Sequence, residues 1–171
     1  EGQTLGIPYV RREWLEEASA GLIALSGGVA GEVGQALASD KQTIARERAS
    51  YWMSLYPGRF YLELHRSGRE AEEACLHASV SLAEELQCPI VATNDVRFLD
   101  ADEFEAHEAR VCIGEGRTLD DPRRARRYTA QQYLRSPEEM TALFSDLPEA
   151  LENSVQIARR CNVVLELGKP Y

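Results

Sequence analysis

Residues 60–95 read FYLELHRSGREAEEACLHASVSLAEELQCPIVATND, in which two short apolar runs flank a longer amphipathic segment. The aromatic-rich run 60–65 and the run 89–93 are typical of buried strands. Between them the apolar positions recur at helical spacing: Cys75, Ala78, Leu82 and Leu86. The acidic pairs lie mostly off this apolar stripe: Glu72/Glu73 and Glu84/Glu85. Residues 71–86 are therefore predicted to form an amphipathic helix that covers a sheet.

A third apolar run, residues 21–26, precedes this unit and ends in a glycine pair, as expected of a buried strand that enters a tight loop. Residues 31–38 and 41–56 are predicted helices, the second with Asp40 as its N-cap and Pro57-Gly58 as its stop. Neighbouring parallel strands need long crossover connections, which are usually helical. Three apolar strands joined by two such connections therefore predict an α/β fold with a parallel sheet or barrel.

Helices dominate the predicted structure after Asp100. Residues 102–114 form the first of them. The sequence Ser136-Pro137-Glu138-Glu139 combines an N-cap, a proline at the first helical position and a glutamate at the third, so it marks a second helix start. Asp146-Leu147-Pro148-Glu149 repeats this logic for a last helix over about 148–161. Residues 163–167 are expected to form a final strand.

Length and composition limit the class of protein. The 171 residues, 44% hydrophobic and 27% charged, predict a single soluble globular domain. A net charge of −9 argues against nucleic acid wrapped over the whole surface. No apolar run approaches the roughly 20 residues of a membrane span, and no signal peptide is visible. The start at Glu1 without Met indicates a piece of a longer protein, and the cysteine pattern described next favours the cytoplasm.

The four cysteines are widely spaced, with no C-x-x-C motif, which predicts free thiols in a reducing compartment rather than a zinc site: Cys75, Cys88, Cys112 and Cys161.

Polar residues that carry chemistry in parallel βα folds lie at the carboxyl ends of the strands. Here these ends are 26–28, 65–68 and 93–97. If the chain stays extended past Thr93, Asp95 and Arg97 point to the same side. Asp95 is then a candidate metal ligand or general base. The alternative, which the sequence supports equally, is a carboxylate held by Arg97 or by loop amides.

The other polar candidates favour structural roles. His65 and His77 are predicted to be packing or solvated residues, and His107 is not part of an H-E-x-x-H motif. The glycine-rich loop 25–31 lacks the G-K-[ST] of a phosphate-binding loop. A basic run is a candidate for contact with a DNA backbone, or else a solvated loop beside Asp120 and Asp121: Arg123, Arg124, Arg126 and Arg127.

Ordered blocks of the sequence resemble a known family: residues 25–32, 60–64, 91–98 and 102–108, continued by 128–133, 138–140 and 158–163. Together they resemble the alpha subunit of bacterial DNA polymerase III, in its proteobacterial version. The resemblance is to the later part of the N-terminal PHP (polymerase and histidinol phosphatase) domain of that subunit, and it covers nearly the whole chain.

The resemblance implies a partial PHP-type βα barrel, seven-stranded and related to the TIM barrel, with a helical C-terminal part. Residues 1–171 are then the C-terminal portion of one PHP domain. About 1–100 would form the βα barrel units, and about 101–171 a mainly helical continuation toward the polymerase core. The family's opening H-x-H motif is absent from this sequence, and the polymerase's catalytic aspartates belong to a domain expected after Tyr171.

Metal-binding members of the family have Cys at the position of Gly28, often His at that of Ser67, and His at that of Arg97. Of the ligands expected here, only a vestigial Asp95 remains. Metal-assisted phosphoester hydrolysis needs a cluster of carboxylate and imidazole ligands, whereas glycine offers no ligand and guanidinium repels cations. We therefore expect no metal, cofactor or catalytic residue in this segment. Arg97 is expected to pair with Asp95 in place of the cation.

For the parent protein, the resemblance implies template-directed DNA synthesis by a nucleotidyltransferase, with magnesium bound in its polymerase domain. It also implies DNA, the proofreading exonuclease subunit and other polymerase III holoenzyme subunits as partners, and no membrane. This segment is then a metal-free structural and subunit-docking module, with the acidic helix faces over 72–85 as docking candidates. The alternative is a metal-dependent phosphoesterase or 3′–5′ exonuclease of the PHP family.

Overall fold

The computed structural model describes residues 3–4, 7–164 and 167–168. Its centre is a three-stranded parallel sheet in the order β3-β4-β5, formed by Ala24–Leu25, Phe60–Leu64 and Ile90–Ala92. Ala24 pairs with Phe60, and Leu62 pairs with Ile90. The predicted α/β class with parallel strands is therefore confirmed. The described strands do not close into a barrel.

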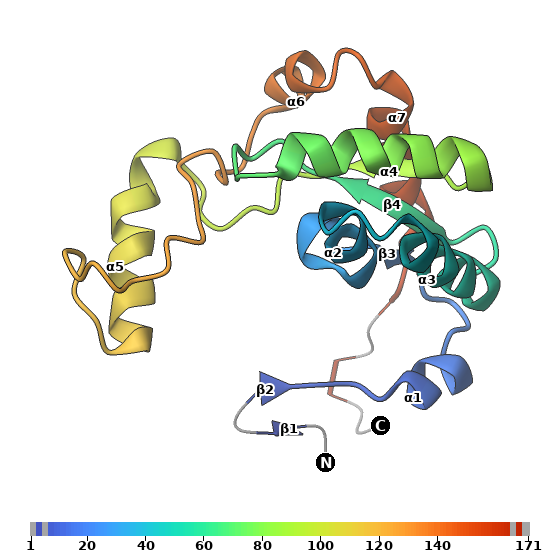
Figure 1. The fold of residues 1–171 in the computed structure, drawn as a ribbon, viewed down its shortest axis with the longest axis horizontal. Helices are drawn as coiled ribbons and strands as arrows, with labels where there is room; N and C mark the ends of the chain where they lie inside the picture. The colour runs from blue at the N-terminus through green and yellow to red at the C-terminus, as the bar shows by residue number, and fades with distance from the viewer. Residues whose placement is uncertain (1–2, 5–6, 165–166, 169–171) are drawn as a thin grey trace.

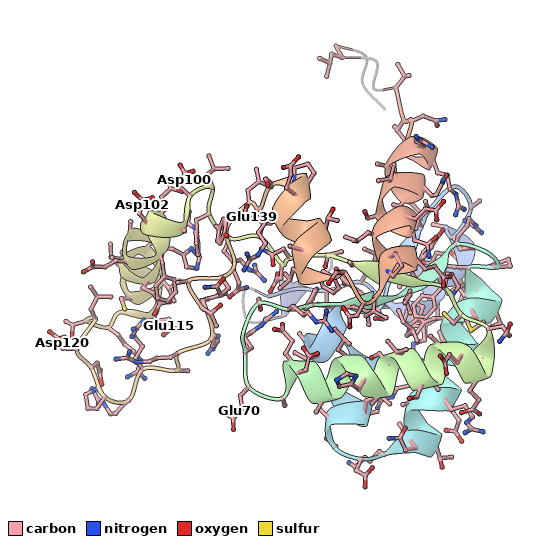
Figure 2. The ribbon with its side chains drawn as sticks, turned by 90° about the horizontal axis from the view of Figure 1, so that it is seen from above. Glu70, Asp100, Asp102, Glu115, Asp120 and Glu139 are labelled. Atoms are coloured by element: carbon pink, nitrogen blue, oxygen red, sulfur yellow. The ribbon has the colours of Figure 1, made fainter. Side chains whose placement is uncertain are left out.

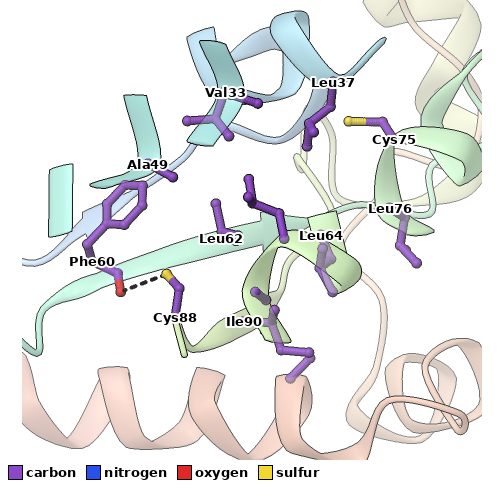
Figure 3. Packing of buried hydrophobic residues seen from close by; sticks show 14 of the residues in the cluster. Val33, Leu37, Ala49, Phe60, Leu62, Leu64, Cys75, Leu76, Cys88 and Ile90 are labelled. Atoms are coloured by element: carbon purple, nitrogen blue, oxygen red, sulfur yellow. Dashed lines mark hydrogen bonds between the residues drawn. The ribbon is translucent and has the colours of Figure 1, made fainter. Parts of the chain in front are cut away.

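Helices cover both faces of this sheet (Figure 1). Helix α2 (Glu32–Ala38), α3 (Gln42–Leu55) and α4 (Glu72–Leu86) supply the crossovers. Helix α7 (Pro148–Arg160) packs against β5 from the opposite side. Figure 3 shows the core side chains gathered around β4, with α7 as the salmon helix on the far side of that strand from α2 and α3.

The core combines large side chains on the strands with small ones on the helices. Leu62 and Leu64 of β4 are 1% exposed, and Val33 of α2 packs in the same cluster. Ala45 and Ala49 of α3 are fully buried, and their small size permits close helix packing. This packing holds the carboxyl ends of the strands in fixed positions relative to one another.

The remaining elements surround the sheet. Helix α1 (Arg12–Glu17) follows a short antiparallel pair, β1 (Gln3–Thr4) and β2 (Ile7–Pro8), and the 3-10 turn η1 (Gly28–Ala30) precedes α2. After β5 come η2 (Ala101–Glu103), α5 (Phe104–Glu115) and α6 (Pro137–Leu143). Helix α5 and the chain around it, residues 99–128, form a lobe that stands away from the sheet (Figure 1); we call this the α5 lobe.

The predicted helices and strands agree with the structure in their order, with local differences. The strand predicted as buried over 21–26 is limited to Ala24–Leu25, and Leu22 and Leu25 are exposed. Asp40 is not the N-cap of α3, since Lys41 occupies that position and Asp40 has a φ of 54°. Leu147 rather than Asp146 precedes α7 as its N-cap. Glu72 is 4% exposed, although its helical position predicted a solvent-facing side chain. Of the strand expected over 163–167, Val163 and Val164 are in irregular chain, and 165–166 lie outside the described residues.

The start of α6 follows the prediction in detail. Ser136 Oγ accepts from the backbone N–H of Glu139 at 3.2 Å, and Glu139 Oε2 accepts from the N–H of Ser136 at 2.7 Å. This reciprocal pair is the capping box that the sequence indicated. Across the described ranges, no helix combines the length and the apolar character that a membrane crossing requires.

Candidate functional site

The candidate site lies where β5 ends. Asn94 Nδ2 donates to the carbonyl oxygens of Gln131 and Tyr133, at 3.0 and 2.7 Å. The backbone N–H of Arg97 donates to the carbonyl of Gln132 at 2.8 Å. The segment 131–133 is therefore hydrogen-bonded to the chain that follows β5. Between these anchors Asp95 has a left-handed backbone, with a φ of 43°, which is rare for a residue with a Cβ.

Asp95 is held by three side chains from three different segments. Arg97 Nη2 lies 2.7 Å from Oδ1, and Arg69 Nη2 lies 3.0 Å from Oδ2. Gln132 Nε2 also donates to Oδ2 at 3.0 Å. The pair between Asp95 and Arg97 follows the sequence expectation. Arg69 and Gln132 were not identified from the sequence, because no local pattern connects them to Asp95.

Arg69 links Asp95 to a second, buried carboxylate. Arg69 Nη2 lies 3.3 Å from Glu72 Oε1. Ser67, which is fully buried, donates from its backbone N–H to Glu72 Oε2 at 2.6 Å and from its hydroxyl to Oε1 at 2.9 Å. The carbonyl of Ser67 accepts from the hydroxyl of Thr129. Ser67 and Glu72 therefore position Arg69 beside Asp95.

Glu63 and His65 form the other side of the site. His65 Nδ1 lies 3.4 Å from Arg69 Nη2, which can only donate, so the imidazole proton is assigned to Nε2. His65 Nε2 lies 3.3 Å from Glu63 Oε1. Burial tends to raise the pKa of Glu63, but His65, the Thr93 hydroxyl and the N–H of Gly27 outweigh it and hold this pKa below its ordinary value.

Gly28 packs directly against His65. Its φ is +54°, and a Cβ at this position would lie 2.3 Å from Nδ1 of the imidazole. A side chain at position 28 would therefore displace His65, in addition to straining the backbone. The glycine is a requirement of this arrangement of the site, because it lets the loop after β3 touch the imidazole.

The donor set of this site does not fit a metal centre. Metal clusters need several carboxylate, imidazole or thiolate ligands whose lone pairs face the ion. Both oxygens of Asp95 already face guanidinium groups, from Arg97 and Arg69. Within residues 3–4, 7–164 and 167–168, no group of three or more His, Cys, Asp or Glu side chains is arranged to hold a metal.

The other predicted candidates lie away from this site. His77 is exposed on α4, 3.6 Å from Glu73. His107 of α5 is buried against the rings of Phe98 and Tyr128, with centroid distances of 5.5 and 4.8 Å. Both histidines therefore have surroundings unlike that of His65.

The basic run of the α5 lobe does not form one surface. Arg124 is buried in an ion pair with Glu108, and its side chain is 5% exposed. Arg123 and Arg127 are exposed and lie near Asp121 and Glu115, respectively; Arg126 is exposed as well. Figure 2 shows acidic side chains on the outer surface of the same lobe, at Asp100, Asp102 and Asp120. Three arginines therefore remain accessible to a partner.

Comparison with known proteins shows which family this sequence resembles. Residues 1–67 match the family model described as PHP domain. The whole chain is 56% identical to DNA polymerase III subunit alpha of Pseudomonas aeruginosa, over 15% of that protein. It is 52% identical over 164 residues to the same subunit of Escherichia coli K12 and 49% identical over 164 residues to that of Vibrio cholerae, in each case 96% of this chain and 14% of the relative.

The chain thus spans about one seventh of the length of the curated relatives that it matches. These relatives are all alpha subunits of proteobacterial origin, and the matched family model names the same domain that the strand-end motifs indicated. The chain therefore belongs to the family of proteobacterial DNA polymerase III alpha subunits, as a segment that includes part of the PHP domain.

Proposed function

We propose that this chain is a metal-free, non-catalytic structural and subunit-docking module of a replicative DNA polymerase. The observation that supports it is Asp95 held between Arg69 and Arg97. A fixed guanidinium charge beside a carboxylate offsets the desolvation that a partly buried lone carboxylate would suffer. Two permanent cations at this position make a metal ion redundant for the charge balance and repel it.

The proposal also covers the domain boundaries of this chain and the activity and partners of the longer protein that contains it. Residues 1–171 form the C-terminal portion of one PHP domain, with βα units over about 1–100 and a mainly helical continuation over about 101–171. The protein that contains this segment performs template-directed DNA synthesis in the cytoplasm, with magnesium in a polymerase domain outside this chain. Its partners are DNA, the proofreading exonuclease subunit and other holoenzyme subunits.

The metal-free role is tested on the intact alpha subunit. We expect elemental analysis to find substoichiometric zinc and manganese. Any hydrolysis of a 3′-labelled oligonucleotide should proceed at the same rate in the wild type and in Asp95→Asn. The variant controls for contaminating nuclease, because contamination is indifferent to position 95. Stoichiometric metal that is lost in Asp95→Asn, together with hydrolysis lost in the same variant, would contradict the proposal and establish the phosphoesterase or exonuclease alternative.

For docking, the exposed face of α4 is the proposed surface. Glu72 is excluded, since it is buried against Ser67. Glu73 and Glu84 remain exposed, and Glu84 borders a groove of about 510 Å³ that also contains Pro148 at the start of α7. Acidic side chains at the rim of such a groove favour a basic partner segment.

We expect Glu84→Lys to weaken binding of the exonuclease subunit to the intact alpha subunit by about tenfold, as measured by surface plasmon resonance. Glu70→Lys is the matched control, because Glu70 has the same charge and is exposed in the loop before α4 (Figure 2). Equal affinities of the two variants would remove this face of α4 from the docking surface.

A further inference from the structure

A pocket of about 310 Å³ separates the end of β5 from α5, and we propose that it binds a phosphate group. Its lining includes Arg97, Phe98, Leu99, Ala106, His107 and Arg110. It shares only Arg97 with the side chains around Asp95, so it is a different site from the one that faces the strand ends. The inference does not depend on the role proposed for this chain in DNA synthesis.

Arg97 presents part of its guanidinium to this pocket. Its Nη2 is bound to Asp95, its side chain is 42% exposed, and its Cζ lies 5.4 Å from the centroid of the Tyr128 ring. Among the described residues, Asp95 is the one carboxylate that forms an ion pair with Arg97. Donors of the guanidinium therefore remain available on the edge that does not face Asp95.

Arg110 is the second cation of the pocket, and within the described ranges it forms no ion pair. It is exposed on α5, and its Nη2 lies 3.1 Å from His107 Nδ1. Glu103 also lines the pocket, but its Oε2 accepts from the N–H groups of Leu99 and Asp100, at 2.8 and 3.1 Å. These N–H groups lower the pKa of Glu103, so the carboxylate stays charged, but it is oriented toward the start of the helix and, among the described residues, forms no ion pair with Arg110.

His107 lies behind the two arginines and responds to their charge. It is 7% exposed, and because Arg110 can only donate to Nδ1, its proton is assigned to Nε2, which has no hydrogen-bond partner in the described part of the chain. Burial, then Arg110 and Arg97, lower the pKa of His107, against the opposing charge of Glu108. The imidazole is therefore neutral near pH 7, as expected in a region of positive potential.

Two guanidinium groups from different elements that border one cavity match the chemistry of phosphate recognition. Planar guanidinium donors bind phosphate oxygens with strong, charge-assisted hydrogen bonds. The volume lies near the lower end of the roughly 300–1,000 Å³ of small-molecule sites, which suits one phosphate group with little attached. A free phosphate and the phosphate of a nucleotide share this chemistry.

The first experiment titrates the intact alpha subunit, in buffer with a metal chelator, with inorganic phosphate and separately with a deoxynucleoside monophosphate, by calorimetry. We expect Arg110→Gln to weaken binding of the better ligand about tenfold or more. Arg159→Gln is the matched control, since it removes the same charge from an exposed helical position on α7, away from this pocket. Tighter binding of the nucleotide identifies it as the source of the phosphate, and equal binding identifies the free anion. Wild-type affinity in Arg110→Gln would overturn the proposal.

A second readout locates the anion beside His107. The groups around this imidazole are Arg110 and Glu108 on α5, Arg97, Phe98 and Tyr128 from other segments, and Glu103 of η2 in the lining of the same pocket. A bound anion offsets the positive potential, so it favours the imidazolium. We expect sulfate, whose own charge is constant, to bind more tightly as pH falls from about 8 to about 5. His107→Gln should bind sulfate at pH 8 without this dependence. Sulfate affinity that is independent of pH in the wild type would contradict the location.

Discussion

Gly28 and His65 illustrate how one missing side chain shapes this site. The loop after β3 passes so close to the imidazole that a Cβ on Gly28 would lie 2.3 Å from Nδ1. His65 in turn lies between Arg69 and Glu63, with a 3.4 Å contact to the first and a 3.3 Å contact to the second. The glycine at position 28 and the imidazole of His65 are therefore two parts of one packing arrangement.

We predict that Gly28→Ala destabilises the chain by about 3 kcal/mol, from the left-handed backbone and the collision with His65 together. Gly58→Ala is the matched control, because its φ is +65° but a Cβ there has no neighbour within 4 Å. It should cost only about 1–2 kcal/mol. Urea unfolding measures both values, and equal losses would show that the close approach to His65 has no energetic consequence.

The two arginines on Asp95 should differ in their contribution to stability. The Arg97 side chain is 42% exposed, whereas that of Arg69 is 19% exposed and contacts both Asp95 and Glu72. We predict a loss of about 1 kcal/mol for Arg97→Leu, since Asp95 keeps Arg69 as its partner. Arg69→Met should cost about 3 kcal/mol, because two carboxylates then lose their shared cation.

Denaturant unfolding of the two single variants tests this ranking, with Asp95→Asn added to each as a control. The added substitution should recover part of the loss in the Arg69→Met background, where it removes an unpaired charge. A larger loss for Arg97→Leu than for Arg69→Met would assign the main stabilising role to Arg97 instead.

At the scale of elements, Arg66 fastens the turn between α6 and α7 to the end of β4. Its guanidinium donates to the carbonyl of Leu143 at 2.7 Å and to both carboxylate oxygens of Asp146, at 2.6 and 2.8 Å. It also lies 5.1 Å above the ring of Phe144, which is fully buried. The acidic residue before α7 therefore docks the helix pair on the sheet, rather than capping the helix.

This contact makes stability depend on pH. Arg66 lowers the pKa of Asp146 to about 2 from an ordinary 3.8. A carboxylate with a depressed pKa stabilises the folded state above its unfolded-state pKa, and the stabilisation disappears as pH falls through the folded-state value. We predict that Asp146→Asn lowers the melting temperature at pH 6, and that the difference from wild type shrinks between about pH 4 and about pH 2.

Asp120→Asn is the matched control, since Asp120 is exposed on the α5 lobe (Figure 2). Its melting temperature, measured by circular dichroism, should equal that of the wild type at every pH. A difference between Asp146→Asn and wild type that stays constant down to pH 2 would contradict the role of the Arg66 ion pair.

At the scale of the whole molecule, the α5 lobe is separated from the sheet and held by a few buried contacts of its own. The ion pair between Arg124 and Glu108 fixes the loop after α5 against that helix. Its partners are both nearly fully buried, so this arginine has a structural role. The neighbouring Arg123, Arg126 and Arg127 are exposed on the same loop.

We propose these exposed arginines as contacts to the DNA backbone in the intact alpha subunit. Replacing Arg123, Arg126 and Arg127 together by Gln should lower the affinity for a primed template and flatten its salt dependence by about 0.9 log units per lost phosphate contact. Arg124→Gln is the contrasting variant, which should reduce stability instead. Fluorescence anisotropy over a range of salt concentrations measures both effects, and an unchanged slope in the triple variant would dismiss the contact.

The sequence alone determined the local elements and the class of fold. Periodic apolar residues, the apolar runs of β3, β4 and β5, and the Ser136 capping box are each set by neighbours within a few positions along the chain, so they were predictable. The strand-end motifs sufficed to identify the family. The pairing of Asp95 with Arg97 was also predicted, but the extended chain assumed for it is absent. Asp95 has a φ of 43°, so the path of the loop rather than strand alternation brings the two side chains together.

Only the tertiary structure decided what else meets at the strand ends. Arg69 follows β4 and Gln132 lies beyond α5, yet both contact Asp95. Glu72 looked solvent-facing from its helical position, but the backbone of Ser67 and the guanidinium of Arg69 bury and satisfy it. Such contacts depend on the register of parallel strands and on loop paths, which bring together residues far apart in sequence. No short-range pattern encodes them, because each partner is locally an ordinary polar residue.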